Sequence, residues 1–275
     1  MSFENYQFGY SLTGRSDRVP ILFLHGFMGD RHDFDLTTSR LMDGYPCLAI
    51  DLPGHGETQV REEADYGMAL TARAIIGALD QLQISQCFLV GYSMGGRLAL
   101  YLTVHFPSRF PRVVLESASP GLKTKKERKQ RVQQDERLAR ELETDFANFL
   151  TNWYGQPLFA SMKHLKDNSQ SPTLAQILER RQQNQPYELA KSLRNLGTGS
   201  QPSLWTELAQ HPVPLRLVVG ELDQKFVQIN QEMQAICPSA QLQIVAGCGH
   251  NIHVENVQGF VESLREFLGA LTPSI

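Results

Sequence analysis

A serine flanked by glycines stands where a short apolar run meets a helical pattern. The segment GYSMG, residues 91–95, follows the run CFLV at residues 87–90 and precedes a helical pattern over residues 94–105. Small residues on both sides of a serine allow a sharp strand-to-helix turn, which leaves the hydroxyl exposed above the edge of a sheet. The segment therefore predicts a nucleophile elbow with Ser93 at its tip.

Two backbone amides are expected to form an oxyanion hole beside this serine. Met94 opens the predicted helix, where the first N–H groups have no partner within the helix and the helix dipole favours negative charge. Phe27 lies in the segment HGF, which directly follows the strand-like run ILFL at residues 21–24. The loop after that strand supplies the second amide of such a hole, so we expect the N–H groups of Phe27 and Met94 to stabilise an oxyanion.

A serine hydroxyl needs a base to take its proton, and the base needs an acid that fixes its tautomer. After a G-x-S-x-G turn these residues follow in the order acid, then histidine. Asp223 ends the segment GELD after the strand-like run LRLVV, and His250 ends the segment GCGH after the run LQIV. We predict Asp223 as the acid and His250 as the base. Glu221 and Glu116 are the alternative acids, and His253 is the alternative base.

Two earlier histidines are not expected to act as the base. His25, in HGF, is interpreted as a structural loop histidine. His55 lies in the segment DLPGHG, residues 51–56, and therefore precedes Ser93 in the chain. That order is the wrong one for the base of such a site.

Positioning these side chains requires a central sheet. Strand-like runs occur at residues 21–24, 47–50, 87–90, 113–115, 215–219 and 242–245, and the clearest helical patterns lie at 68–82, 94–105, 227–236 and 254–271. Short apolar runs without alternation are typical of parallel strands buried on both faces. Alternating strands and helices predict right-handed crossovers, and hence an α/β fold with a mostly parallel central sheet.

The middle of the chain differs from the two ends. Residues 121–143 carry 13 charged side chains, eight basic and five acidic, and further helical patterns lie at 146–150, 174–181 and 187–196. We interpret residues 121–210 as a helical cap inserted into a core made of residues 1–120 and 211–275. Most charges of the run are expected to face solvent. The segment LGTGSQP is expected to be a turn-rich junction and not a phosphate loop, because no Lys-Ser/Thr pair follows its glycines.

The overall composition excludes several classes of protein. With 26 Lys and Arg against 29 Asp and Glu, the net charge of −3 argues against nucleic acid or an anionic membrane as a partner. No apolar run approaches the ~20 residues that span a bilayer, and the N-terminus lacks a secretory signal pattern. The four cysteines lie far apart without a CxxC pair, which favours buried free thiols and a cytoplasmic protein.

Arg97 stands four positions after Ser93, on the same face of the predicted helix and in its first turn. A cation there opposes the helix dipole, so an anion is expected beside it. That anion is either a carboxylate of the protein or a carboxylate of the substrate. The basic run adds local positive charge, because residues 121–143 carry +3 and the remaining chain carries −6.

The segments HGF, DLPGHG, GYSMGG, GELD and GCGH together resemble the α/β-hydrolase superfamily over the whole chain apart from the insertion. The segments GYSMGGRLALYL, LESASPGL, NWYGQPLF and SLRNLGTGSQPSLW further resemble the MenH family. Members of that family are 2-succinyl-6-hydroxy-2,4-cyclohexadiene-1-carboxylate synthases of menaquinone and phylloquinone biosynthesis. This second resemblance extends through the insertion, where the superfamily pattern offers no match.

The resemblance to MenH implies a lyase that eliminates pyruvate from 2-succinyl-5-enolpyruvyl-6-hydroxy-3-cyclohexene-1-carboxylate. Ser93, activated by His250 and Asp223, would remove the ring proton next to the succinyl carbonyl, so no acyl-enzyme forms. The runner-up is a serine hydrolase that cleaves an ester or a C–C bond of an anionic substrate on the same residues.

The resemblance also implies how the substrate is held. Arg97, Arg131 and Arg181 would bind the carboxylates of this small-molecule polycarboxylate, with Arg180 as the alternative to Arg181. Trp153 matches an aromatic residue of the family's pocket; without the resemblance it is equally well interpreted as core packing. Tyr92, next to the nucleophile in the sequence, is interpreted either as part of the pocket floor or as a plug under the elbow. No metal or organic cofactor is expected, and we expect a monomer or a weak homo-oligomer.

Overall fold

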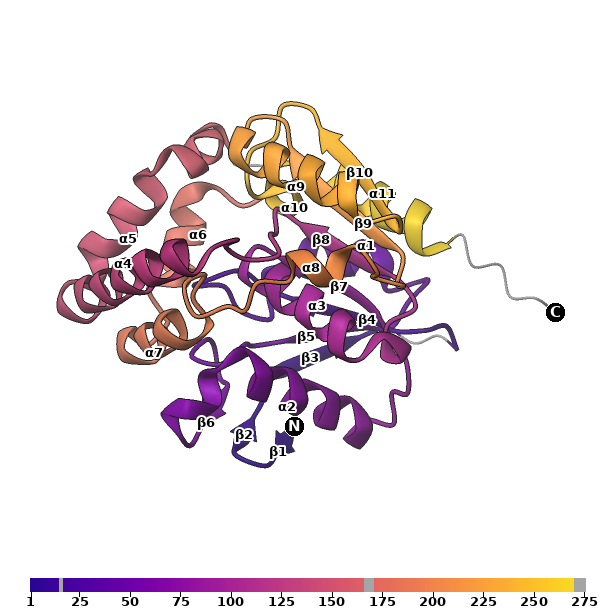
Figure 1. Cartoon of the computed structure of the whole chain (residues 1–275), viewed down its shortest axis with the longest axis horizontal. Helices are drawn as coiled ribbons and strands as arrows, with labels where there is room; N and C mark the ends of the chain where they lie inside the picture. Colours follow the sequence, from indigo (N-terminus) through magenta and orange to yellow (C-terminus); the bar gives the residue numbers. More distant parts are fainter. Residues whose placement is uncertain (15–16, 166–170, 270–275) are drawn as a thin grey trace.

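The computed structural model describes residues 1–14, 17–165 and 171–269, and it has a layered α/β arrangement (Figure 1). Within these residues a seven-stranded sheet has the order β10-β9-β8-β7-β4-β5-β3. Only the edge strand β3 pairs antiparallel, which confirms the expected mostly parallel central sheet. Its strands are β3 (Tyr10–Thr13), β4 (Ile21–Leu24), β5 (Cys47–Ile50), β7 (Phe88–Tyr92), β8 (Val113–Glu116), β9 (Leu215–Gly220) and β10 (Ala240–Val245).

Helices cover both faces of this sheet, and strand β4 shows the reason. Successive side chains of a strand point to opposite faces. Leu22 and Leu24 pack into one apolar cluster, and Ile21 and Phe23 into another. On the first face lie α2 (Met68–Gln81), α3 (Met94–His105) and α9 (Gln224–Ile236); on the second lie α1 (Asp35–Leu41), α10 (Ile252–Glu255) and α11 (Val257–Gly269).

A further group of helices lies between β8 and β9 in the chain. Figure 1 shows α4, α5, α6 and α7 gathered at one end of the sheet. A third apolar cluster joins them, and Met28 of the core is part of it. We propose residues 121–210 as one cap. Its elements are α4 (Lys125–Thr144), α5 (Phe146–Gly155), the 3₁₀ segment η3 (Pro157–His164), α6 (Leu174–Arg181), α7 (Pro186–Leu196) and α8 (Trp205–Leu208).

Some elements differ from the sequence prediction. Three two-residue strands, β1 (Ser2–Phe3), β2 (Tyr6–Gln7) and β6 (Gln59–Val60), form a small sheet, and η1 (Glu63–Tyr66) is a 3₁₀ turn. The single helix expected over residues 254–271 is divided at Asn256, whose side chain accepts a hydrogen bond from the Gly259 amide at 2.9 Å and caps α11. Residues 270 and 271 of that prediction lie outside the described residues.

Cys47, Cys87, Cys237 and Cys248 are all buried and unpaired, as free thiols were expected to be. In the part of the chain that the structure describes, no helix has the length and apolar character needed to cross a membrane.

Candidate active site

Ser93 lies in the turn between β7 and α3, with a backbone φ of 48°. This left-handed conformation is uncommon for a residue other than glycine and is typical of a nucleophile elbow. The turn is also tightly packed, because a Cβ on Gly95 would lie 2.2 Å from the Leu24 carbonyl oxygen. A side chain at that position would push α3 away from β4 and displace Ser93.

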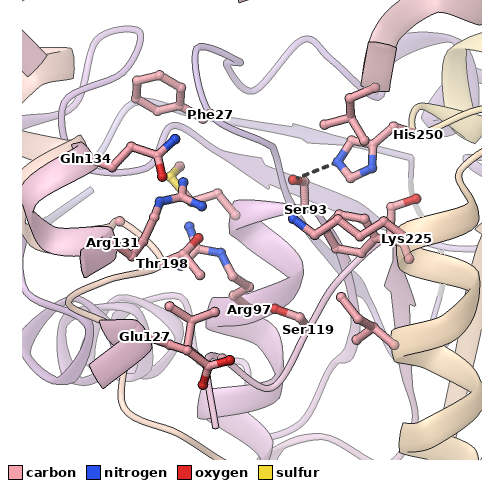
Figure 2. A pocket seen from close by; sticks show the side chains of 18 of the residues that line it. Phe27, Ser93, Arg97, Ser119, Glu127, Arg131, Gln134, Thr198, Lys225 and His250 are labelled. Atoms are coloured by element: carbon pink, nitrogen blue, oxygen red, sulfur yellow. Dashed lines mark hydrogen bonds between the residues drawn. The ribbon is translucent and has the colours of Figure 1, made fainter. Parts of the chain in front are cut away.

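Ser93, His250 and Asp223 form one chain of hydrogen bonds. The Nε2 atom of His250 lies 3.0 Å from Ser93 Oγ (Figure 2). Its Nδ1 atom lies 2.6 Å from Asp223 Oδ2. Because an ionised carboxylate only accepts hydrogen bonds, Nδ1 carries the proton, and Nε2 is left to accept the serine hydroxyl proton. Asp223 and His250 are both buried, and Asp223 also accepts the Phe226 amide at the start of α9.

The side chains of the alternative acids and base make no hydrogen bond to Ser93 and have other partners. Glu116 and His253 pair with each other, with Glu116 Oε2 lying 2.8 Å from His253 Nδ1. Glu221 is exposed and accepts the Gly247 amide at 3.0 Å. The structure therefore brings the three predicted residues together and separates them from their competitors.

The two predicted oxyanion donors, Phe27 and Met94, both line a cavity that contains Ser93. Within the described parts of the chain neither backbone amide donates a hydrogen bond, so both are available to a bound anion. The next amide, that of Met28, donates to Nε2 of His55 at 3.0 Å. Met28 has a φ of 65°, and His55 therefore helps to hold a strained loop.

The two earlier histidines make contacts that suit neutral imidazoles. His55 Nδ1 donates to the Pro53 carbonyl at 3.0 Å, and burial lowers the pKa of His55 well below its usual value, with nearby His25 acting in the same direction. His25 Nε2 accepts the Leu52 amide at 2.9 Å. Both side chains join loops at the carboxyl ends of strands, and neither hydrogen-bonds to Ser93.

The cavity above Ser93 has a volume of about 550 Å³. Figure 2 shows Arg97 and Arg131 to one side of Ser93 and Lys225 to the other. Four cationic side chains line it against two carboxylates, which leaves a local charge of +2. These are Arg97, Lys123, Arg131 and Lys225 against Glu127 and Glu232.

Arg97 is a buried cation, and among the described residues it makes no ion pair. Its Nη1 atom donates to the Leu196 carbonyl at 2.9 Å and to Gln201 Oε1 at 3.0 Å. Burial lowers the pKa of the Arg97 guanidinium to about 10, with Arg131 acting in the same direction and Asp135 opposing both. Arg97 therefore stays charged at neutral pH. The anion expected beside Arg97 is not a carboxylate of the described residues, which leaves a substrate carboxylate.

Trp153 is part of the cavity wall and of the cap interior at once. It lines the cavity, and its ring centroid lies 5.3 Å from that of Phe27 and 5.5 Å from that of Phe149. The pocket role and the packing role of this residue are thus compatible.

The structure does not bring Arg181 or Tyr92 to the cavity wall. Arg181 is buried and donates to both carboxylate oxygens of Asp33, at 2.6 and 3.0 Å, because its position on α6 turns it towards the core. Its neighbour Arg180 contacts Asp30 at 2.6 Å. Tyr92 is buried beneath the elbow, with its ring 5.5 Å from that of His250, which favours the plug over the pocket floor.

Among the polar residues missed in the sequence are Lys225, which lines the cavity, and Gln201, whose side chain contacts Arg97. Lys225 lies in the first turn of α9, two positions after Asp223. The first-turn signal used for Arg97 did not apply to Lys225, because the sequence pattern placed the start of this helix at residue 227, three positions later than the structure does. Gln201 carried no such signal. In the described ranges, no three His, Cys, Asp or Glu side chains are grouped so that they could hold a metal ion.

Comparisons with known proteins agree over the whole chain. Residues 19–257 match the α/β hydrolase fold family. A Bacillus subtilis (strain 168) protein, whose name provisionally gives the activity 2-succinyl-6-hydroxy-2,4-cyclohexadiene-1-carboxylate synthase, is 37% identical over 98% of this chain and 97% of its own. The synthase of that name from Serratia proteamaculans (strain 568) is 34% identical over 93% and 95%. The structure of MenH from S. aureus superposes with a TM-score of 0.88 at 32% identity, covering 98% of this chain and 99% of that one.

Proposed function

The chain belongs to the α/β-hydrolase fold family and, within it, to the 2-succinyl-6-hydroxy-2,4-cyclohexadiene-1-carboxylate synthases, and from this we infer that it is a lyase of menaquinone or phylloquinone biosynthesis. Its substrate is then 2-succinyl-5-enolpyruvyl-6-hydroxy-3-cyclohexene-1-carboxylate, and pyruvate is eliminated. The structural observation that carries this function is the buried, unpaired charge of Arg97, one helical turn from Ser93. A neutral ester substrate would leave this buried charge without a counter-ion.

The elimination begins with removal of the ring proton at C2, next to the succinyl carbonyl. Ser93 Oγ takes this proton while its own hydroxyl proton passes to His250 Nε2, 3.0 Å away. Asp223 stabilises the imidazolium that results, through the 2.6 Å contact to Nδ1. Proton transfer by a positioned base of this kind contributes about 10²–10⁴-fold in rate.

The electron pair from the broken C–H bond first forms an enolate on the succinyl carbonyl. The amides of Phe27 and Met94 are proposed to hold that oxygen. When the enolate collapses, C2=C3 forms, the C3=C4 double bond moves to C4=C5, and the C5–O bond breaks. The leaving group is enolpyruvate, which takes up a proton to become pyruvate, and no covalent enzyme intermediate forms.

The three carboxylates of the substrate need cations around the cavity. Arg97 and Arg131 are proposed as two of their partners, since an arginine fork meets a carboxylate with two parallel hydrogen bonds. Trp153 supplies an apolar part of the cavity wall beside Phe27. The charge of Arg181 is compensated by Asp33, and this side chain does not line the cavity, so Arg181 is not proposed as a partner of a substrate carboxylate.

An assay of pyruvate release from the enolpyruvyl substrate tests this function. Wild-type protein should release one pyruvate per substrate, and Ser93→Ala should lower kcat by on the order of 10²–10⁴-fold. Ser108→Ala, an exposed serine outside the cavity, is the matched control and should keep full activity. Hydrolysis of p-nitrophenyl esters without pyruvate release would overturn the lyase in favour of the serine hydrolase.

We also propose a cytoplasmic location, which four buried free cysteines suit because thiols persist in a reducing compartment. The partner is the small-molecule substrate alone. The protein is proposed to be a monomer or a weak homo-oligomer, and sedimentation velocity over a range of concentrations tests this.

A further inference from the structure

The loop of residues 197–201, here called the junction loop, joins the end of α7 to the segment that returns to the core. Arg97 is held jointly by this loop and by the end of α7. The carbonyl of Leu196, the last residue of α7, accepts a hydrogen bond from Arg97 Nη1 at 2.9 Å. Gln201 Oε1 accepts from the same nitrogen at 3.0 Å. The guanidinium is thus fixed by the cap although it belongs to a core helix.

The same loop also fixes the partner of Arg131. Asp135 is buried; its Oδ1 accepts from Arg131 Nε at 2.7 Å and its Oδ2 from the Gly199 amide at 3.1 Å. The loop packs closely on α4, since a Cβ on Gly199 would lie 2.5 Å from the Val132 nitrogen. The junction loop therefore contacts Arg97 directly through Gln201 and supports Arg131 through Asp135.

The two arginines differ in charge compensation. Arg131 faces a carboxylate, whereas the acceptors at Arg97 are a backbone carbonyl and an amide, both neutral. Gln201 is 1% exposed, and its Nε2 donates to the Ser119 carbonyl at 3.4 Å, which orients the amide oxygen towards Arg97. A glutamate would fit the same space but would neutralise the guanidinium.

We propose that Gln201 is a positioning residue that fixes Arg97 through a neutral acceptor, so that the full charge of Arg97 remains for a substrate carboxylate. The junction loop then sets the spacing between two anion subsites. Arg97 forms the stronger one, and Arg131, whose charge is paired with Asp135, forms the weaker one. This proposal rests on the proposed function, since it concerns how the polycarboxylate substrate is recognised.

The variant Gln201→Glu keeps an acceptor for Arg97 at position 201 but neutralises the charge of Arg97. An opposite charge at this distance keeps the new carboxyl ionised, and it still accepts from Arg97, now with a stronger charge-assisted bond. We expect the KM for the enolpyruvyl substrate to rise by about tenfold, equivalent to roughly 1.4 kcal/mol, with a smaller change in kcat. The unfolding temperature should change little, because the charge-assisted bond to Arg97 offsets the lost hydrogen bond to the Ser119 carbonyl.

Gln201→Met is the matched variant, because it removes the acceptor and leaves the charge of Arg97 intact. It should lower the unfolding temperature, since a buried donor loses its partner, but raise KM less than Gln201→Glu. If Gln201 only stabilised the fold, the variant with the lower unfolding temperature, Gln201→Met, would show the larger loss of activity. If KM is unchanged in Gln201→Glu, or if KM rises more in Gln201→Met than in Gln201→Glu, this proposal is overturned while the proposed function stands. Wild-type protein that releases no pyruvate would overturn the proposed function and this proposal together.

Discussion

The carboxylate of Asp223 contacts both the base and the helix that follows it. One oxygen accepts from His250 Nδ1 and the other from the Phe226 amide. Asp223→Asn keeps the cap of α9 but can present an N–H to Nδ1, which favours the tautomer that cannot accept the Ser93 proton. We expect kcat to fall by about 10⁴-fold, with little change in the free energy of unfolding measured in urea. A loss below tenfold would contradict the role of Asp223.

Some of these residues could be predicted from the sequence because their position depends on local order. Ser93 and Asp223 each follow a buried strand, and the ends of parallel strands meet at one edge of a sheet. The partner of Arg181 could not be predicted in this way, because Arg181 lies on a helix between β8 and β9 and no motif relates that helix to Asp33. Gln201 was missed for the same reason, since neither a strand end nor a motif relates it to Arg97.

Helix α6 is joined to the core by the ion pair between Arg181 and Asp33. Both side chains are buried, so removing one leaves an uncompensated charge in the interior. We expect Arg181→Met to lower the free energy of unfolding by about 3–5 kcal/mol in urea at pH 7. Arg180→Met is the control on the same helix; its side chain is 39% exposed, and a loss of at most about 1 kcal/mol is expected. Equal losses in the two variants would contradict this role of the pair.

The same pair gives the wild-type protein a defined sensitivity to acid. Burial alone would raise the pKa of Asp33, but the charge and hydrogen bonds of Arg181 outweigh it and lower that pKa to about 2. In the unfolded chain the value is about 3.9. The stabilisation is therefore complete above about pH 4 and is lost as the pH falls towards 2.

The elements of the fold could be predicted to different degrees. Helices α3 and α6 have the expected bounds, because each has a run of helical periodicity with clear ends. Strands β1, β2 and β6 have two residues each, which is too short for any period, and they exist because they pair with one another. The break before α11 depends on the side chain of Asn256 and leaves no periodic signal.

At the scale of the whole molecule, charge is distributed unevenly. The chain carries −3 overall, yet the side chains that line the cavity carry +2. A substrate with three carboxylates is therefore repelled by the protein as a whole and attracted by the cavity. Salt screens both effects, with a Debye length that falls from about 30 Å at 0.01 M to about 8 Å at 0.15 M. The sign of the salt effect shows which of the two dominates capture of the substrate.

We expect kcat/KM to fall severalfold over this range of salt, because a cavity lined by one sign of charge raises the local concentration of an opposite charge. Lys225→Gln should make the fall shallower. Arg73→Gln, on the exposed face of α2, changes the net charge equally but lies outside the cavity wall, so it should leave the slope unchanged. A kcat/KM that rises with salt, or equal slopes in the two variants, would mean that the net charge governs capture and that the cations above Ser93 do not attract the substrate.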